Sequence, residues 1–360
     1  MLTIINGKIH NDESKRPAIG TNCRIITIKS NCVHESKALY TIENILVNGG
    51  RYDTYVLKNT ITGKVKNASI IGINEYVSIS DFSQNIQACI TGNNAMLDFQ
   101  ALESELRTCK YETVRHAIEL FDMVRKGYIA AAFELWSYMI CDNFTGKMKG
   151  NHGISTSVKL NLHCQLAQKD NSCICHDCYA EKIRESQAYK LALNTLVLCT
   201  YRFQDCELPY LNCHMFRLES FGDLLNTTQA YNYIALSRKN FMVTFAQWTK
   251  RPAIMHNAFT EYFQGIKPEN MIVVYSSKRV NHCEDISGKF ILANGQDMIN
   301  HVFTVYTASY AIEHNIVIHC LKSVCVNCQL CYRKDSPYFI NEIIKKEQNT
   351  YIKMKGNLLS

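Results

Sequence analysis

The cysteines of this chain are concentrated in two short stretches, and this clustering constrains the fold more than any other feature of the sequence. The first stretch runs C-Q-L-A-Q-K-D-N-S-C-I-C-H-D-C-Y over residues 164–179, and the second lies within residues 320–331. Four thiols in the first stretch form what we call the upstream group: Cys164, Cys173, Cys175 and Cys178. Four in the second form the downstream group: Cys320, Cys325, Cys328 and Cys331.

The compartment expected for the chain determines how these cysteines are interpreted. The N-terminal segment MLTIINGKIHND has no basic stretch followed by an apolar one, so no signal peptide is predicted. The sequence contains no run of about 18 apolar residues, so no membrane span is predicted. We therefore expect a cytoplasmic protein with no membrane contact, in which disulfides are rare and dense cysteines are typical of metal or iron–sulfur sites. The scattered cysteines are predicted to be small core residues: Cys23, Cys32, Cys89, Cys109, Cys141 and Cys199.

Composition adds broad limits. Hydrophobic residues make up 47% of the chain and charged residues 20%, which is typical of a globular protein. A length of 360 residues favours more than one domain. The formal net charge of +7 permits contact with nucleic acid or another polyanion through a local patch but does not require it.

The pattern of apolar residues divides the chain into four segments. Residues 1–85 carry short β-branched runs separated by Gly, Asn and Asp, together with an Asn48-Gly49 turn signal, and are expected to form a small β-rich accessory region. Residues 86–150 are expected to be a helical region and linker, with one helix ending at Gly127. Residues 151–336 are expected to form the main domain, and residues 337–360 a C-terminal tail. The core face of the predicted helix is Val114, Ile118, Phe121 and Val124.

The main segment alternates strand candidates with stretches long enough for a helix. The six candidates are Ser157–Leu162, His214–Leu218, Phe241–Ala246, Met271–Tyr275, Val302–Tyr306 and Asn315–His319. This alternation predicts an α/β fold with a parallel sheet, specifically a partial (βα)6-type barrel with an N-terminal β-rich and helical extension. Because chemistry in such folds gathers at the carboxyl ends of the strands, both thiol groups are expected at the same rim.

Spacing indicates what the thiols bind. The downstream pattern C-x4-C-x2-C-x2-C contains the C-x4-C-x2-C of plant-type ferredoxin loops, although structural zinc accepts the same ligands. The upstream pattern is less regular, with a common chelating pair at Cys175 and Cys178 and an unusual C-x-C before it. The upstream thiols could hold their own cluster, form a zinc clip, or contribute Cys164 or Cys173 to one site shared with the downstream group.

Several motifs resemble a known family. The string C-H-D-C-Y-A over Cys175–Ala180 resembles the CxxCYA signature of radical SAM-type barrels, and is most similar to bacteriophage relatives of that group, the actinophage "gene product eighty-eight" family. The usual radical SAM C-x3-C-x2-C is absent, and the residues before 140 are not covered. Four further stretches resemble that family in the same order: Thr145–Met148, His214–Asp223, Phe245–Pro252 and Cys325–Tyr332.

The resemblance implies an iron–sulfur protein, with a 4Fe-4S cluster and S-adenosylmethionine as a further cofactor, acting on an unknown substrate. Ser220, Gly222 and Asp223 at a strand end are the expected cofactor contacts, since Gly lets backbone approach closely and a carboxylate accepts from an amine or ribose hydroxyl. Arg217 and Lys250 could line the mouth and meet a carboxylate or phosphate. The structural alternative is a tight turn in which Asp223 caps the following helix.

Two functions therefore compete. The first is a radical SAM-like enzyme whose cluster supports reductive chemistry. The second is a non-catalytic protein in which iron–sulfur or zinc sites staple a barrel that engages nucleic acid or a host protein. A three-thiolate loop with an open iron favours the enzyme, whereas closed four-thiolate sites favour the binding protein.

Overall fold

The computed structural model describes residues 2–5, 8–10, 22–29, 32–35, 40–46, 54–59, 62–68, 70–73, 90–91, 96–321 and 323–359. The chain divides into two compact units, Met1–Phe82 and Ser83–Ser360, which we describe separately.

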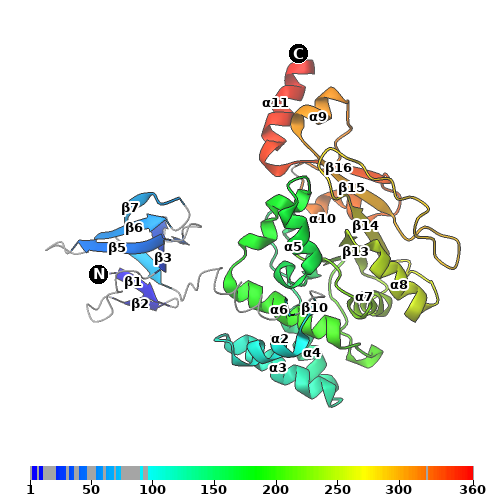
Figure 1. The fold of residues 1–360 in the computed structure, drawn as a ribbon, viewed down its shortest axis with the longest axis horizontal. Coiled ribbons are helices and arrows are strands. Elements are labelled where there is room, and N and C mark those ends of the chain that lie inside the picture. Colours follow the sequence, from blue (N-terminus) through cyan, green and yellow to red (C-terminus); the bar gives the residue numbers. More distant parts are fainter. Residues whose placement is uncertain are drawn as a thin grey trace. The chain divides into compact units, whose positions relative to one another are not determined.

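The described residues of the first unit form strands and one turn (Figure 1). The strands are β1 (Leu2–Ile5), β2 (Lys8–His10), β3 (Asn22–Lys29), β4 (Cys32–Glu35), β5 (Tyr40–Leu46), β6 (Thr54–Asn59), β7 (Val65–Ala68) and β8 (Ile70–Ile73). They are ordered β2-β1-β8-β3-β5-β6-β7, with β4 beside β3, and β1 runs parallel to β8. Side chains such as Tyr55 and Leu57 are fully buried in its core, together with Cys23. The predicted Asn48-Gly49 turn lies outside the described residues.

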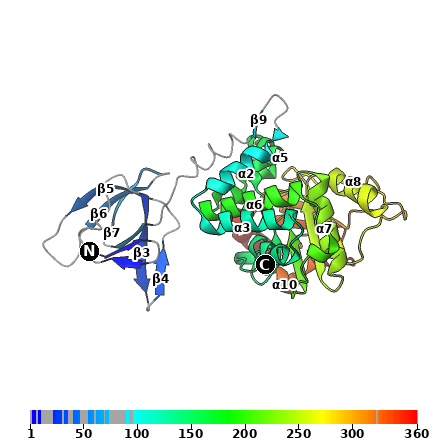
Figure 2. The same cartoon turned by 90° about the horizontal axis from the view of Figure 1, so that it is seen from below.

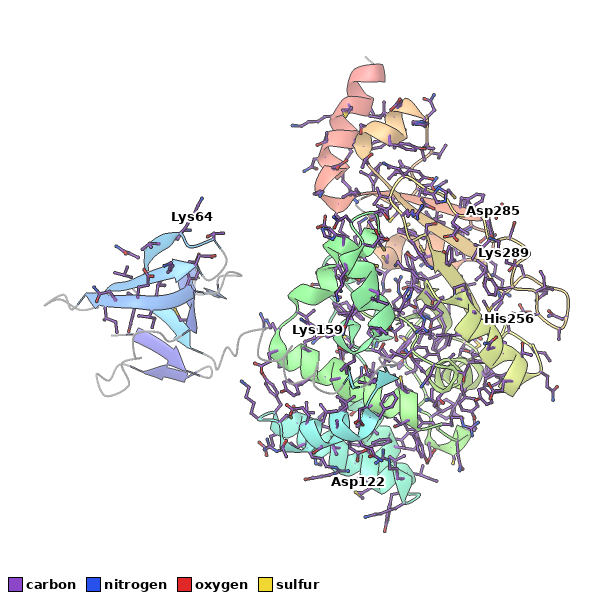
Figure 3. All side chains as sticks on the ribbon, in the orientation of Figure 1. Lys64, Asp122, Lys159, His256, Asp285 and Lys289 are labelled. Carbon is purple, nitrogen blue, oxygen red and sulfur yellow. The ribbon has the colours of Figure 1, made fainter. Side chains whose placement is uncertain are left out.

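A helical segment lies near the start of the second unit. It follows the short pair β9 (Ile90–Thr91) and β10 (Met96–Leu97) and consists of α2 (Phe99–Thr108), α3 (Glu112–Arg125) and α4 (Ile129–Met139). The four predicted core residues of α3 are all buried. Gly127, at φ +87°, follows the end of α3, as predicted. Arg107 of α2 donates to Asp122 of α3 at 2.7 and 2.8 Å, and Figure 3 labels Asp122.

A parallel sheet forms the centre of the second unit. In its described residues the strands are β11 (His152–Ile154), β12 (Met215–Leu218), β13 (Thr244–Thr249), β14 (Met271–Ser276), β15 (His301–Tyr306) and β16 (Phe339–Ile343). They lie in chain order, and every neighbouring pair is parallel. The predicted α/β class with a parallel sheet is therefore confirmed.

Two of the six predicted strand positions are wrong. The stretch Ser157–Leu162 contains a 3-10 turn at Val158–Leu160, and the first strand lies just before it. Asn315–His319 forms no strand, and the sixth strand is β16, in the segment expected to be a tail. A short apolar run does not by itself specify a strand: Val158 and Leu160 are buried from a 3-10 turn, whereas Val317 is exposed in a loop.

Helices connect and follow these strands. They are α5 (Leu162–Lys169), α6 (Glu185–Thr200), α7 (Thr227–Lys239), α8 (Pro252–Phe263), α9 (Ala308–Glu313), α10 (Cys325–Cys328) and α11 (Gln348–Leu359). In Figure 2, α6, α7 and α8 lie side by side, in agreement with their contacts. None of the described helices has the length and apolar character needed to cross a bilayer.

The two faces of the sheet differ because successive side chains on a strand point to opposite sides. On β12 and β13, Phe216 and Phe245 are fully buried and their ring centres lie 5.4 Å apart. Arg217, which follows Phe216, and Trp248, three residues after Phe245, lie on the opposite face of the sheet and line a cavity. One face of the sheet therefore serves the core, and the other presents side chains to this cavity.

Candidate thiol-lined site

A cavity of about 560 Å³ lies at the carboxyl ends of the parallel strands. Trp248, Phe303 and Ile340, from β13, β15 and β16, form part of its wall. All eight clustered thiols and the five residues expected to contact a cofactor also line it: Cys164, Cys173, Cys175, Cys178, Cys320, Cys325, Cys328, Cys331, Arg217, Ser220, Gly222, Asp223 and Lys250. Segments separated by more than 150 residues in the sequence thus meet at one cavity.

The upstream thiols are presented by α5 and by a 3-10 turn, η4 (Ile174–Asp177). Cys173 accepts a hydrogen bond on its sulfur from the backbone nitrogen of Cys175 at 3.4 Å. The turn is anchored to the loop after β14, because Ile174 donates its backbone N–H to the carbonyl of Lys278 at 2.8 Å. Cys164 is buried and packs with Cys178 in a small apolar cluster.

The downstream thiols are presented by three connected elements. The backbone nitrogen of Cys320 donates to the carbonyl of Asn341 at 3.0 Å, which ties this cysteine to β16. Cys325 and Cys328 begin and end the single turn of α10, and a spacing of three residues brings helical side chains to one face. Cys331 lies in the following 3-10 turn, η7 (Leu330–Tyr332).

Burial makes five of these eight thiols weaker acids than an ordinary cysteine. It raises the pKa of Cys175 to about 11 and that of Cys320 to about 12. Burial likewise raises the pKa of Cys164, Cys325 and Cys331. Thiolates therefore form here only when a cation compensates them, and a bound metal ion supplies such compensation.

Three basic side chains provide fixed positive charge. Lys147 Nζ lies 3.6 Å from Cys320 Sγ and 2.5 Å from Glu342 Oε1. Lys250 Nζ donates to Ser276 Oγ at 3.2 Å. Burial acts to lower the pKa of Lys250, but the nearby Cys175 and Asp223 raise it, and the net shift is upward.

The third basic side chain is Arg217. Its guanidinium carbon lies 3.8 Å from the centre of the Trp248 ring, in a cation–π arrangement. Its positive charge lowers the pKa of Cys325 and Cys331, partly offsetting the effect of burial on those thiols.

Asp223 lines the cavity and also joins the segment after β12 to the end of β13 through hydrogen bonds. Its Oδ1 accepts from Thr249 Oγ1 at 2.6 Å, and its Oδ2 accepts from the backbone nitrogen of Lys250 at 2.9 Å. The alternative in which Asp223 caps the next helix is wrong, because Asn226 caps α7. Contact between Asp223 and a cofactor stays a prediction.

Gly222 is required by close packing within the protein. A Cβ at this position would lie 2.5 Å from both Glu219 Oε2 and Thr156 Oγ1. The close approach of this glycine to a cofactor stays a prediction, and the atoms that the structure places against it belong to the chain itself.

The sequence reasoning did not single out Glu219, a buried carboxyl beneath this loop. It adopts φ +58° and accepts hydrogen bonds from Gln229 Nε2 at 2.6 Å, from Tyr233 Oη at 2.5 Å and from Thr156. Burial is the main cause that raises its pKa, to about 7. The available signal was a carboxyl placed directly after the apolar end of a predicted strand, at Leu218.

Several buried polar atoms at the cavity have no hydrogen-bond partner in the described part of the chain. They are Arg217 Nε, Ser220 Oγ, Trp248 Nε1, His163 Nε2 and Tyr332 Oη. Buried polar groups in native proteins are nearly always satisfied, so atoms of this kind indicate where a ligand would complete the bonding. The sequence reasoning missed His163, which lies next to Cys164.

The donor set suits a soft metal. Every cysteine whose side chain the structure describes is a free thiol, and among the scattered ones Cys23, Cys109 and Cys199 are buried as predicted, whereas Cys141 is half-buried. Cys32 and Cys89 lie outside the ranges for which side chains are described. Within the described residues, no three Cys, His, Asp or Glu side chains are already arranged to hold a metal ion. The thiols border the cavity without forming a closed coordination shell.

No protein-family model, curated protein or solved structure matches this chain.

Proposed function

We propose that this chain is an iron–sulfur protein of the radical SAM-like type, with the upstream and downstream thiols as cluster ligands. The observation that carries the proposal is the convergence of eight thiols and three basic side chains on one cavity at the carboxyl ends of six parallel strands. Thiolates are the ligands that iron–sulfur clusters use, and basic side chains offset their charge.

The strand order supports the barrel part of the proposal. A parallel sheet whose strands follow chain order, without the reversal of a doubly wound sheet, is the arrangement of a (βα) barrel. We therefore describe the second unit as an open, partial barrel of six strands. Its free thiols fit a reducing, cytoplasmic compartment.

The cavity also has the size and the polar atoms for an organic cofactor. Its volume lies within the usual range of ligand sites. Ser220 Oγ is buried and has no partner among the described residues, and it could donate a hydrogen bond to a carboxylate such as that of S-adenosylmethionine. A bound cluster would supply the electron for reductive cleavage of that cofactor. The chain's residues bind and orient the cofactor and keep water away from it.

One observation favours a second candidate. Each group contains four thiols, enough to close a tetrahedral site with no open position. In that case the chain would be a metal-stapled protein, with iron–sulfur or zinc sites, whose net charge of +7 favours nucleic acid over a host protein as partner.

Anaerobic purification followed by iron, sulfide and zinc analysis tests the proposal. We expect iron and sulfide in equal amounts, and slow formation of deoxyadenosine when the reduced protein meets S-adenosylmethionine. Cys206→Ser, which changes an exposed thiol outside the cavity, is the matched control and should load normally. Zinc without sulfide would refute the iron–sulfur proposal, and loaded protein that neither binds nor cleaves the cofactor would refute the enzyme.

A further inference from the structure

We infer that the two thiol groups form two separate metal centres, and that Arg217 is the counter-charge of the downstream centre. This inference rests on the proposed function, since it concerns the same thiols. It answers a question that spacing leaves open, namely whether Cys164 or Cys173 joins the downstream cysteines in one shared site.

The two groups are embedded in different apolar clusters. Cys164 and Cys178 pack with Val158, Ala180 and Phe221, close to the ends of β11 and β12. The cluster beneath the downstream group consists of other residues, from β13 to β16 and the segment that follows β15: Ile272, Val274, Phe303, Ile340, Trp248, Val305, Cys320, Leu330 and Cys331. No residue is common to both clusters.

Backbone hydrogen bonds fix each group in its own place. The backbone of Cys320 is bonded to Asn341 of β16, at one edge of the sheet. Cys164 lies in α5, which follows β11 of the other edge after a 3-10 turn. The turn that carries Cys173 and Cys175 is bonded to Lys278 in the loop after β14. These hydrogen bonds tie the thiols of the two groups to different connections of the sheet.

The electrostatic surroundings of the groups also differ. Lys250 lies close to the upstream group, whose Cys175, Cys164 and Cys173 help to raise its pKa. Arg217 lies instead with the downstream group, because its guanidinium carbon is 3.8 Å from the centre of the Trp248 ring and Trp248 packs in the cluster that contains Cys320 and Cys331. Each group therefore has a basic side chain of its own.

Arg217 is the stronger of the downstream counter-charges. Lys147 is already paired with Glu342, so that its charge is largely compensated. For Arg217, by contrast, no carboxylate partner is found among the residues that the structure describes, and its buried Nε has no acceptor. A buried N–H of a charged group without an acceptor is costly, and the negative charge of a thiolate-bound cluster would reduce that cost at Arg217 Nε. We assign Arg217 the role of a positioning residue whose positive charge stabilises the downstream centre.

The number of centres can be measured by loading variants anaerobically. If each group holds a four-iron cluster, the wild-type chain binds about eight irons. The double variants Cys175→Ala/Cys178→Ala and Cys325→Ala/Cys328→Ala should each lose about half of the iron and retain the paramagnetic signal of the other cluster. If either double variant loses all iron while the wild type loads, the centre is shared and the inference fails. A wild-type chain that binds no iron would overturn the proposed function itself.

The role of Arg217 is tested by the midpoint potential of each centre, measured by electron paramagnetic resonance during a redox titration. Positive charge near a cluster favours its reduced form, so Arg217→Gln should lower the potential of the downstream centre alone. Lys250→Gln should lower that of the upstream centre alone, and Arg217→Lys should stay close to wild type. Equal shifts of both centres, or none, in Arg217→Gln would refute the assignment. Should that variant fail to fold, Lys250→Gln decides the matter, because a shift of both centres would show that they are not separate.

Discussion

Asp223 accepts a hydrogen bond from the backbone nitrogen of Lys250 at 2.9 Å, which joins the segment after β12 to the end of β13. The same carboxylate accepts from Thr249 Oγ1 at 2.6 Å. These bonds give Asp223 a role in shaping the cavity that is separate from any contact with a ligand.

Asp223→Asn should destabilise the metal-free protein. The amide replaces one acceptor oxygen by a donor that faces the backbone N–H of Lys250 or the hydroxyl of Thr249, and a lost charge-assisted hydrogen bond in a buried site costs about 1.5–3 kcal/mol. Denaturant unfolding of the apo protein measures this cost. Asp335→Asn is the control: its carboxylate forms only an exposed pair with Arg333, and its removal should leave stability nearly unchanged. Equal stabilities for the two variants would contradict the connecting role of Asp223.

Removal of metal should lower the melting temperature of the second unit. Metal–thiolate bonds form in the folded state, so the binding free energy adds to that of folding. At free metal about 100 times above the dissociation constant this contribution is about 2.7 kcal/mol. Melting curves before and after anaerobic chelation measure the difference, and Cys206→Ser should behave as the wild type. Equal melting temperatures with and without metal would contradict a structural contribution of the thiols.

Gly222→Ala should be destabilising by roughly 1–3 kcal/mol, because the added methyl group would overlap Glu219 Oε2 and Thr156 Oγ1. Gly356→Ala provides the matched control. Gly356 lies in α11 and a Cβ there meets nothing within 4 Å, so alanine should be neutral or stabilising. Urea unfolding of both variants checks the prediction, and a Gly222→Ala protein as stable as the control would show that the loop has room to move.

The sequence predicted those parts of the fold that depend on local patterns. Met271–Tyr275 and Val302–Tyr306 were recognised as strands because continuous apolar, largely β-branched runs of this length are typical of buried parallel strands. The sixth strand was missed because the polar Asn341 and Glu342 interrupt its apolar residues.

The candidate site was predicted unevenly for a related reason. Clustered cysteines are visible in the sequence whatever the fold does, and the structure brings all eight to one cavity. The role of Glu219 depends on Thr156, 63 residues earlier, and on a left-handed backbone conformation. Neither leaves a periodic pattern, because contacts between distant segments follow from the fold as a whole.

The final prediction concerns the buried carboxyl of Glu219. Its pKa is about 7 in the folded chain, above the usual value of 4.5, and burial is the main cause. A carboxyl whose pKa is raised by folding favours the native state fully below the unfolded pKa, and this contribution is lost as the pH rises from about 4.5 through about 7.

We therefore expect the stability of the wild-type chain to fall between pH 5 and pH 8 relative to that of Glu219→Gln, by on the order of 3 kcal/mol. Glutamine cannot ionise, so the variant should lack this part of the pH dependence even if lost hydrogen bonds make it less stable overall. Unfolding in urea across this pH range, with metal-free protein, measures both curves. Glu313→Gln, at an exposed position, should keep the wild-type slope. Parallel curves for the wild type and Glu219→Gln would mean that Glu219 has an ordinary pKa, and that its hydrogen bonds from Tyr233, Gln229 and Thr156 fully offset the effect of burial.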